Sequence, residues 1–327
     1  MAAPERNGIA VAGSLLVDKI NEIRAYPRCG ELTKIHSLQK AVGGCVPNVG
    51  IDLKKICPGL PVSAIGIVGN DDDGAYIRQI LSQNGLDISG IMTSDTERTS
   101  FTDVMSITGG QRTFFTYAGA DGQLEARDIP WDALNQKILL LGYFLLLERV
   151  DAGEGLAILQ EASARGISTA IDMVSENSER YALVLPCLPY VDYLIINELE
   201  AGKLTGMEAL PENLPVMAKK LKELGVRQKV ILHMPDRSIC CSDDSIALVG
   251  SLELPEGYIQ GTTGAGDAFC AGALYAIHEG RTDREILEFA SCAAVTALGS
   301  ADATSGLREE KEIMELCSKF RRKPICL

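Results

Sequence analysis

Two kinds of hydrophobic pattern alternate along most of the chain. Short continuous apolar runs indicate strands buried on both faces, and the segments between them carry apolar residues at helical spacing. Strands are expected at residues 9–12, 62–68, 138–144, 167–173, 193–196 and 229–233, with an antiparallel edge at 238–242 and 246–254. The later helices are expected at residues 155–165, 198–204, 214–224, 265–279, 284–297 and 309–320. This alternation predicts an α/β fold whose sheet is mostly parallel and covered by helices on both faces.

One stretch departs from this alternation. Residues 99–107 and 112–117 alternate between apolar and polar positions, and Gly109-Gly110 between them is a turn signal. We interpret them as a β-hairpin in a separate small sheet, because a hairpin interrupts the run of βα units. Such a sheet could cover a site as a lid. We therefore expect a single domain, residues 1–327, with inserted lid strands within about 14–40 and 97–118.

The composition argues against several classes of partner. The chain has 327 residues, of which 46% are hydrophobic, so a sizeable core is available. A net charge of −13 and a pI of about 4.8 make nucleic acid and anionic membrane surfaces poor partners. The longest apolar run, residues 138–147, is too short to span a bilayer.

The cysteines and histidines argue against a zinc site and against disulfides. The ten cysteines contain no Cys-x-x-Cys pair, and the N-terminus shows no secretory signal. Free thiols in a reducing cytoplasm are therefore expected. The only histidines are His36, His233 and His278, and none has ligand spacing to a cysteine pair.

The stretch with the most specific chemistry is Gly261-Thr262-Thr263-Gly264-Ala265-Gly266-Asp267, which leads into a helical pattern. Its glycines let the backbone approach a ligand closely. The free N–H groups of the first helical turn make an anion site of the kind that holds phosphate. Asp267 in that turn could accept a proton from a hydroxyl that attacks a phosphoryl group. The alternative is tight helix–strand packing, with Asp267 as an ordinary dipole partner.

Polar residues also follow other expected strands and turns. Asp18 lies past the first strand, where ligand hydroxyls bind in open α/β sheets, and Asn48 follows the turn Gly43-Gly44. Asn197 and Glu200 stand at a strand end and helix start, where Glu200 could orient water around a magnesium–nucleotide complex. Each also has a structural interpretation. Asp18 would be a turn or cap aspartate, Asn48 would face solvent, and Asn197 with Glu200 would form a capping box.

The usual nucleotide-binding motifs are absent from the sequence. No Walker A motif occurs, and no Rossmann Gly-x-Gly-x-x-Gly follows the first strand. The acidic cluster Asp71-Asp72-Asp73 looks like a metal site, but such a loop is more often a helix cap and a solvated turn. Nucleotide binding would therefore need another scheme.

The motifs together resemble the ribokinase-like, phosphofructokinase-B-type carbohydrate kinases, nearly from end to end. Each piece is short, and their order and spacing carry the resemblance. The pieces are Gly13…Asp18, Gly43-Gly44…Asn48, Gly66-x-x-Gly69-x-Asp71…Gly74, Arg112-Thr113, Gly119-Ala120-Asp121…Leu124, Asn197-x-x-Glu200 and Thr262-x-Gly264-Ala265-Gly266-Asp267-x-Phe269.

The resemblance implies a three-layer α/β/α fold with a small β-sheet lid, and it implies roles for the matching residues. Asp267 would be the base that deprotonates the attacking hydroxyl. The backbone amides of Gly264, Ala265, Gly266 and Asp267 would form the anion hole for the transferred phosphoryl group. In several members of the family such a lid also forms a homodimer interface.

The remaining roles concern the sugar and the nucleotide. Substrate hydroxyls would be held by four residues near the first strand and first long helix: Asp18, Gly43, Gly44 and Asn48. Asn197 and Glu200 would serve magnesium–ATP, with Glu200 acting on Mg²⁺ indirectly through water. ATP and Mg²⁺ are thus the implied cofactors, and a small sugar is the implied substrate.

Three departures from the family pattern stand out. Gly261 replaces an acidic residue or Asn that lies near a monovalent-cation site in some members, so potassium activation is in doubt. His233-Met234-Pro235 occupies the place of a Thr-x-Gly turn, and proline lacks the N–H and the freedom of glycine, so nucleotide binding would be altered there. Cys45-Val46-Pro47 stands where ribokinases tend to carry Lys-Gly, which argues against ribose and sugar phosphates.

The leading interpretation is an ATP-dependent kinase of a small, unphosphorylated sugar. A nucleoside kinase of the same family is the first alternative, and it would need aromatic residues such as those of the lid: Phe101, Phe114, Phe115 and Tyr117. The second alternative is a degenerate member that binds a sugar without catalysis, motivated by Gly261 and residues 233–235. The motifs encode neither the identity of the sugar nor the oligomeric state.

Overall fold

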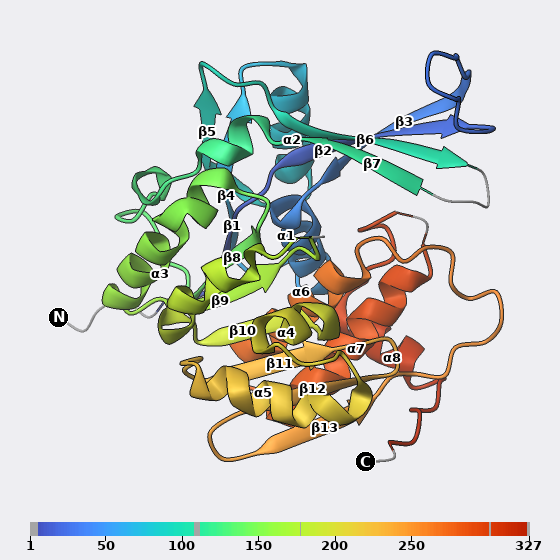
Figure 1. Ribbon diagram of the computed structural model, residues 1–327. Helices are drawn as coiled ribbons and strands as arrows, with labels where there is room; N and C mark the ends of the chain where they lie inside the picture. Colours follow the sequence, from blue (N-terminus) through green and yellow to red (C-terminus); the bar gives the residue numbers. More distant parts are fainter. Residues whose placement is uncertain (1–5, 108–111, 177, 301, 326–327) are drawn as a thin grey trace.

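The computed structural model describes residues 6–107, 112–176, 178–300 and 302–325. One sheet of nine strands runs through the molecule in the order β13-β12-β11-β10-β9-β8-β1-β4-β5 (Figure 1). Its strands are β1 Ile9–Ala12, β4 Val62–Gly69, β5 Asp87–Ser94, β8 Ile138–Phe144, β9 Ser168–Met173, β10 Tyr193–Asn197, β11 Lys229–His233, β12 Arg237–Cys241 and β13 Ile246–Gly250. Neighbours are parallel except at β12 and β13, so the mostly parallel sheet is confirmed.

Helices cover both faces of this sheet. They are α1 Cys45–Ile56, α2 Asp72–Gln83, α3 Gly155–Ala164, α4 Glu198–Thr205, α5 Leu214–Glu223, α6 Ala265–His278, α7 Asp283–Leu298 and α8 Glu310–Cys317. One hydrophobic cluster holds α1, α2, α6, α7 and α8, and a second holds α3, α4 and α5. In β1, Ile9 and Val11 join the first cluster while Ala10 and Ala12 join the second, which is the two-residue period of a strand. The predicted three-layer α/β/α class is therefore confirmed.

Short helical turns fill several of the connections. They are η1 Gly119–Gln123, η2 Ala126–Asp128, η3 Val150–Glu154, η4 Arg180–Tyr190 and η5 Pro211–Asn213. The longest, η4, contains Pro186 and Pro189, whose missing N–H groups are incompatible with an uninterrupted α-helix.

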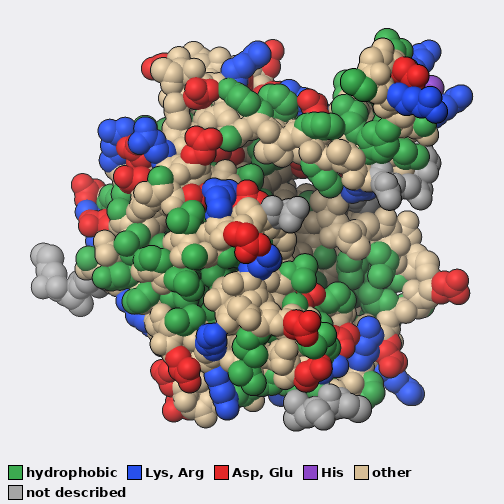
Figure 2. Space-filling view, viewed as in Figure 1, with side chains coloured by type: hydrophobic (Ala, Val, Ile, Leu, Met, Phe, Trp, Pro, Cys, Tyr) green, Lys and Arg blue, Asp and Glu red, His purple; other side chains and the backbone are tan. Residues whose placement is uncertain are grey.

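A second sheet of four strands projects from the body, and we call it the lid sheet (Figure 1). Its order is β3-β2-β6-β7, with β2 Leu16–Ile23, β3 Ile35–Gly43, β6 Ser100–Ile107 and β7 Arg112–Tyr117. The hairpin β6–β7 matches the prediction, while its expected turn at Gly109-Gly110 lies outside the described residues. The strand β3 continues to Gly43, past the expected boundary at residue 40. Hydrophobic side chains gather on this projecting sheet in Figure 2.

The lid sheet is tied to the body through Asp73 of α2. Lys19 of β2 and Lys40 of β3 approach the Asp73 carboxylate at 3.1 and 2.6 Å. Although burial alone would raise it, these two lysines hold the pKa of Asp73 below its usual value. The neighbouring Asp71 caps α2 by accepting the Gly74 N–H, and it also accepts the Thr99 N–H. The acidic cluster is therefore occupied by structural contacts, in line with its interpretation as a cap.

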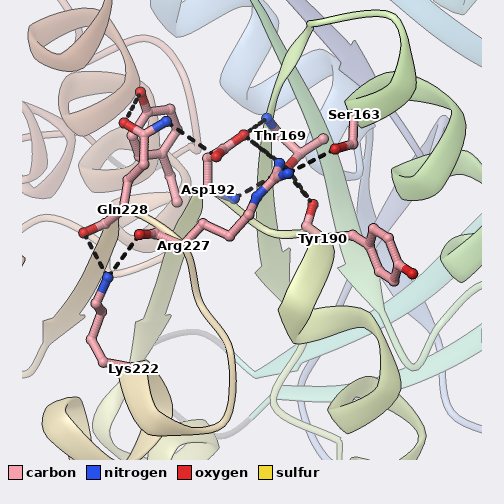
Figure 3. Close-up of polar contacts among 8 residues, drawn as sticks. Ser163, Thr169, Tyr190, Asp192, Lys222, Arg227 and Gln228 are labelled. Atoms are coloured by element: carbon pink, nitrogen blue, oxygen red, sulfur yellow. Dashed lines mark hydrogen bonds and ion pairs between the residues drawn. The ribbon is translucent and has the colours of Figure 1, made fainter.

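A polar network fixes the sheet at the amino ends of β9, β10 and β11 (Figure 3). Asp192 accepts hydrogen bonds from the Thr169 N–H at 2.9 Å, from Arg227 at 2.8 Å and from the Gln228 side chain at 3.1 Å. Lys222 donates to the carbonyl oxygens of Arg227 and Gln228. These contacts join three strand beginnings, so the network is structural and lies at the opposite edge from the strand ends that carry the candidate site.

Two expectations about the whole chain concern thiols and membranes. Each cysteine that the structure describes is a free thiol, as expected. Within the described residues, no helix has both the length and the apolar character needed to cross a membrane. The cytoplasmic location stays a prediction.

Candidate active site

The predicted anion loop opens α6 at the carboxyl edge of the sheet. Gly264 adopts the left-handed conformation with φ 78°, and a Cβ there would lie 2.5 Å from the Cα of Ala303, so only glycine fits. No side chain caps α6 in the described structure, which leaves its first turn available to an anion. The Ala265 N–H donates instead to the Thr262 carbonyl at 3.3 Å, so Gly266 and Asp267 hold the more available amides.

Asp267 lies in this first turn and is almost fully buried. Its Oδ2 accepts a hydrogen bond from Asn48 Nδ2 at 2.9 Å. The Tyr143 hydroxyl donates to both carboxylate oxygens, at 3.1 Å each. Burial raises the pKa of Asp267 to about 6, opposed by the donors Asn48 and Tyr143 and assisted by the charge of Asp18. The carboxylate is therefore mostly ionised at neutral pH and close to the pKa that suits a general base.

The predicted sugar-binding residues surround this carboxylate. Asn48 stands in the first turn of α1, and its Oδ1 is buried without a hydrogen-bond partner among the described residues. A Cβ on Gly43 would lie 2.4 Å from Asp18 Oδ2, so this glycine brings the backbone directly against that carboxylate. Burial raises the pKa of Asp18 to about 6. Asn48 thus holds the Asp267 carboxylate and also offers an unused acceptor.

Asn197 and Glu200 form a capping box at the start of α4. Asn197 Oδ1 accepts the N–H groups of Leu199 and Glu200, and Glu200 Oε2 accepts the Asn197 N–H. The other oxygen of Glu200 accepts the Ser175 hydroxyl at 2.7 Å. Burial raises the pKa of Glu200 to about 7, against these hydrogen bonds. The structure therefore contains the capping box that was the structural interpretation of this pair, and the role of the pair toward magnesium stays a prediction.

A cavity of about 660 Å³ joins Asn197 to the anion loop. Gly266 and Thr262 line it at one end, and its walls are largely apolar: Leu252, Leu254, Ile259, Val295 and Leu298. A long apolar cavity that ends at free helix N–H groups has the shape and chemistry of a nucleotide site. Within the described residues, no cluster of three or more Asp, Glu, His or Cys could hold a metal ion.

The lid sheet reaches the anion loop. Arg112 at the start of β7 donates to the Thr263 hydroxyl at 3.0 Å. This contact joins the projecting sheet to the residue just before Gly264. The role of this sheet as a lid stays a prediction.

Comparison with known proteins shows the family of this chain. Residues 8–310 match the family described as pfkB family carbohydrate kinase. The chain belongs to this family. It is 24% identical to ribokinase of Arabidopsis thaliana over 311 residues, covering 94% of this chain and 80% of that protein. It is 27% identical to adenosine kinase of Schizophyllum commune over 269 residues, covering 77% of each.

A solved structure confirms the fold of this pfkB family member. Arabidopsis thaliana ribokinase complexed with ribose and ATP superposes with a TM-score of 0.80 at 23% identity, covering 95% of this chain and 99% of that one. The predictions of a ribokinase-like fold and of an ATP-dependent carbohydrate kinase are thus confirmed.

One of the three family departures lies on the wall of the apolar cavity. His233, Met234 and Pro235 all line it. The His233 ring packs on Phe269 with centroids 4.6 Å apart, and burial lowers the pKa of His233 to about 4, so the ring is neutral at pH 7. The usual backbone turn is replaced here by an uncharged aromatic surface, which would contact a nucleotide through its face or edge.

Three residues of the pfkB site carried no role in the sequence interpretation. Tyr143 touches the base across 124 positions of sequence. Asp172 is the penultimate residue of β9, and burial together with the charges of Glu200 and Asp267 raises its pKa well above the usual value. Asp121 accepts the Leu15 N–H at 2.9 Å and so holds the turn from β1 into β2. Asp172 and Tyr143 both stand at the carboxyl ends of strands, and that position is the signal that could have singled them out.

Proposed function

We propose that this protein transfers the γ-phosphoryl group of ATP to a hydroxyl of a small, uncharged sugar, with Asp267 as the general base. The observation that carries the proposal is the placement of Asp267, a buried carboxylate held by Asn48 and Tyr143 at the uncapped start of α6. One group there can take a proton while the adjacent amides bind the transferred phosphoryl.

The proposed reaction needs little from the protein beyond position and charge. The sugar hydroxyl oxygen forms a bond to the γ-phosphorus as the bond to the ADP oxygen breaks, and the hydroxyl proton passes to Asp267. The free amides of Gly266 and Asp267 stabilise the charge on the transferred oxygens. The lid sheet, in contact with the anion loop through Arg112 and Thr263, would exclude water during transfer.

The charge around the base favours an uncharged acceptor. Asp18 and Asp172 both face Asp267, and their burial raises their pKa values, so further negative charge in this region is unfavourable. Sugar acids and sugar phosphates would add such charge. The hydroxyls of a neutral sugar can instead donate to Asp18 and to the unused Oδ1 of Asn48, with Gly43 and Gly44 allowing close approach.

The nucleotide would occupy the apolar cavity, with its phosphates directed to the start of α6. Asn197 lines this cavity, whereas both oxygens of Glu200 are occupied by Asn197 and Ser175. Glu200 would therefore act on Mg²⁺ through water rather than directly. Magnesium itself would neutralise the phosphate charge during transfer.

The lid sheet is the surface that we propose for a homodimer. Four large apolar side chains on its strands are exposed, Ile35, Leu38, Phe114 and Phe115, and so is Leu32 in the connection between β2 and β3. Exposed apolar clusters of this kind are uncommon on monomers and are typical of interaction surfaces. A dimer through these strands would also hold the two lids in place.

A nucleoside kinase is the second candidate, and two observations favour it. The chain is similar to an adenosine kinase, and aromatic residues lie on the lid sheet, with Phe101 packed on Tyr117 at 5.4 Å between centroids. A degenerate binder is the third candidate, motivated by Gly261 and residues 233–235. The nucleoside kinase and the degenerate binder would have the same fold as the sugar kinase. The first would act on a different substrate, and the second would bind a sugar without turning it over.

The test is ADP release with Mg–ATP across pentoses, hexoses, sugar acids and nucleosides, with Asp267→Asn as the matched variant. We expect turnover with a neutral sugar and a loss of at least about a hundredfold in kcat in the variant, because a positioned base contributes on that order. Turnover of nucleosides alone would replace the sugar proposal with the nucleoside kinase. Saturable sugar binding by calorimetry without any turnover would identify a degenerate binder.

A further inference from the structure

The carboxyl end of β8 has an unusual backbone. Tyr143 and Leu145 both have positive φ angles, 60° and 78°, and no other described residue except glycine does. The β8–β9 pairing shifts register between Leu141 and Phe144, so the strand bulges at this point. Left-handed conformations are costly for residues with a Cβ and persist where the surrounding structure enforces them. A strained bulge at a strand end therefore indicates that the surrounding structure holds a side chain in a particular position.

The bulge directs the Tyr143 side chain onto the base. Its hydroxyl is shared by Oδ1 and Oδ2 of Asp267, at 3.1 Å from each. Asn48 Nδ2, from α1, donates to Oδ2 at 2.9 Å. The carboxylate therefore accepts hydrogen bonds from two elements, α1 and β8, and the donor from β8 stands on strained backbone.

The two donors do not occupy the carboxylate evenly. A carboxylate oxygen accepts about two hydrogen bonds. Oδ2 receives both Asn48 and the shared tyrosine hydroxyl, while Oδ1 receives only its share of the tyrosine. The unused acceptor capacity of Asp267 therefore lies on Oδ1.

We propose that Tyr143 is a positioning residue that fixes the orientation of the Asp267 carboxylate and leaves Oδ1 as the oxygen that takes the proton from the acceptor hydroxyl. This role rests on the proposed function of Asp267. The proposal identifies Oδ1 as the proton acceptor and Tyr143 as a second hydrogen-bond donor to Asp267 beside Asn48. Neither follows from the sequence motifs.

The groups around Asp267 keep Tyr143 in the state that this role needs. Burial and the charge of Asp267 raise the pKa of Tyr143 well above its usual value, so the phenol remains a donor while Asp267 titrates. The titratable groups that face Asp267 come from β2, α1, β8, β9 and α6: Asp18, Cys45, Asp52, Tyr143, Asp172 and Cys270. All of them are acids or thiols, so hydrogen-bond donors rather than cations must offset the negative charge.

The first experiment follows the Asp267 carboxyl directly, in ligand-free protein labelled at the aspartate side-chain carbon, by NMR between pH 4 and 9. The Asp267 signal is assigned as the one lost in Asp267→Asn. In Tyr143→Phe we expect the midpoint to move to higher pH, because a donor to the ionised form is removed. The matched control is Tyr193→Phe, which removes a buried tyrosine hydroxyl from Gln228 at the far end of β10 and should leave the midpoint unchanged. An unchanged midpoint in folded Tyr143→Phe would overturn the proposal.

The second experiment measures kcat/KM against pH with the sugar that the panel identifies. Tyr143→Phe should lose on the order of tenfold at pH 5 and much less at pH 8, a selective loss that general destabilisation would not produce. If the phenylalanine variant does not fold, incorporation of fluorotyrosine in place of tyrosine supplies a stronger donor, and the Asp267 midpoint should then move to lower pH. A midpoint that does not respond to either change contradicts the role of Tyr143.

The two arms separate this inference from the proposed function. If no sugar or nucleoside is turned over but the NMR midpoint moves as expected, the kinase proposal fails and the support of Asp267 by Tyr143 stands. If turnover is found and the midpoint does not move, the kinase stands and Tyr143 is only a packing residue.

Discussion

At the scale of single residues, the site is a carboxylate whose ionisation is set by burial and by two neutral donors. Burial alone disfavours the charged form of Asp267, and the hydrogen bonds from Asn48 and Tyr143 partly restore it. The result is a pKa of about 6, low enough for Asp267 to be ionised at neutral pH and close to the value that suits the proposed general base.

The first prediction at this scale concerns pH. We expect kcat/KM to fall as the pH is lowered through about 6, because protonated Asp267 cannot accept the hydroxyl proton. Initial rates at subsaturating sugar from pH 5 to 8.5, with coupling enzymes in excess, would measure it. A rate that stays level from pH 7 down to pH 5 would show that another group is the base.

The sequence located Asp267 and Asn48 but not Tyr143, and the difference has a physical cause. Asp267 and Gly264 belong to one loop–helix junction, where the chemistry of the first turn follows from local spacing. Tyr143 reaches the base only because the backbone bulges at the end of β8, and no residue type near it demands that conformation. In an apolar run, a tyrosine looks like any other buried strand residue.

At the scale of elements, the lid sheet depends on a few polar contacts. Its strands β2 and β3 reach α2 through Lys19 and Lys40, and its strand β7 reaches the anion loop through Arg112. The lysines also lie over aromatic rings, at 4.1 Å from the Phe101 centroid and 4.4 Å from that of Tyr76. The position of the lid is therefore controlled by charge as well as by strand pairing.

The prediction at this scale tests that anchoring. Asp73→Asn should raise the KM for sugar about three- to tenfold with little change in kcat, because two partly exposed ion pairs of modest strength are lost. The control is Asp72→Asn, which removes an exposed carboxylate from the same helical turn. Equal KM values in the two variants would show that the ion pairs do not position the lid.

Some elements were easier to predict than others. The strands β8, β10 and β11 are continuous apolar runs, and all were expected close to their observed bounds. The strand β5 was not expected, because its residues are partly exposed and polar and it lies at the edge of the sheet. Edge strands bury only part of their surface, so their hydrophobic pattern is weak.

At the scale of the whole molecule, buried acids link stability to pH. Burial raises the pKa of Asp121 to about 8 and of Glu200 to about 7, whereas such carboxyls titrate near about 4 in an unfolded chain. Between these values the folded protein binds more protons than the unfolded chain does. The free energy of unfolding must therefore fall as the pH rises through this range.

We accordingly expect the ligand-free protein to be more stable to urea at pH 5.5 than at pH 8.5. Asp121→Asn, which cannot ionise, should reduce this difference. Urea unfolding followed by circular dichroism at both pH values, in both proteins, would measure it. Stability that increases from pH 5.5 to 8.5 would mean that these carboxyls are already ionised in the folded state.

The overall architecture was predictable as a class but not as an order of strands. Alternating strands and helices require a parallel sheet with two covered faces. The placement of β1 between β8 and β4 depends on contacts between segments far apart in sequence, which a hydrophobic pattern does not encode. The lid likewise appeared in the sequence as an interruption, and only the structure pairs β2 with β6 to build it.

The capping box at Asn197 and Glu200 affects which residues a relative without catalytic activity would keep. The two side chains start α4 whether or not a nucleotide binds, so a lineage that had lost catalysis would still retain them for folding. Asp267 is different, because its burial near other acids destabilises its charged form, and in the proposed function that cost is retained for catalysis. A substitution at Asp267 is therefore the earlier sign of an abandoned activity, while an intact Asn197 and Glu200 say nothing about it.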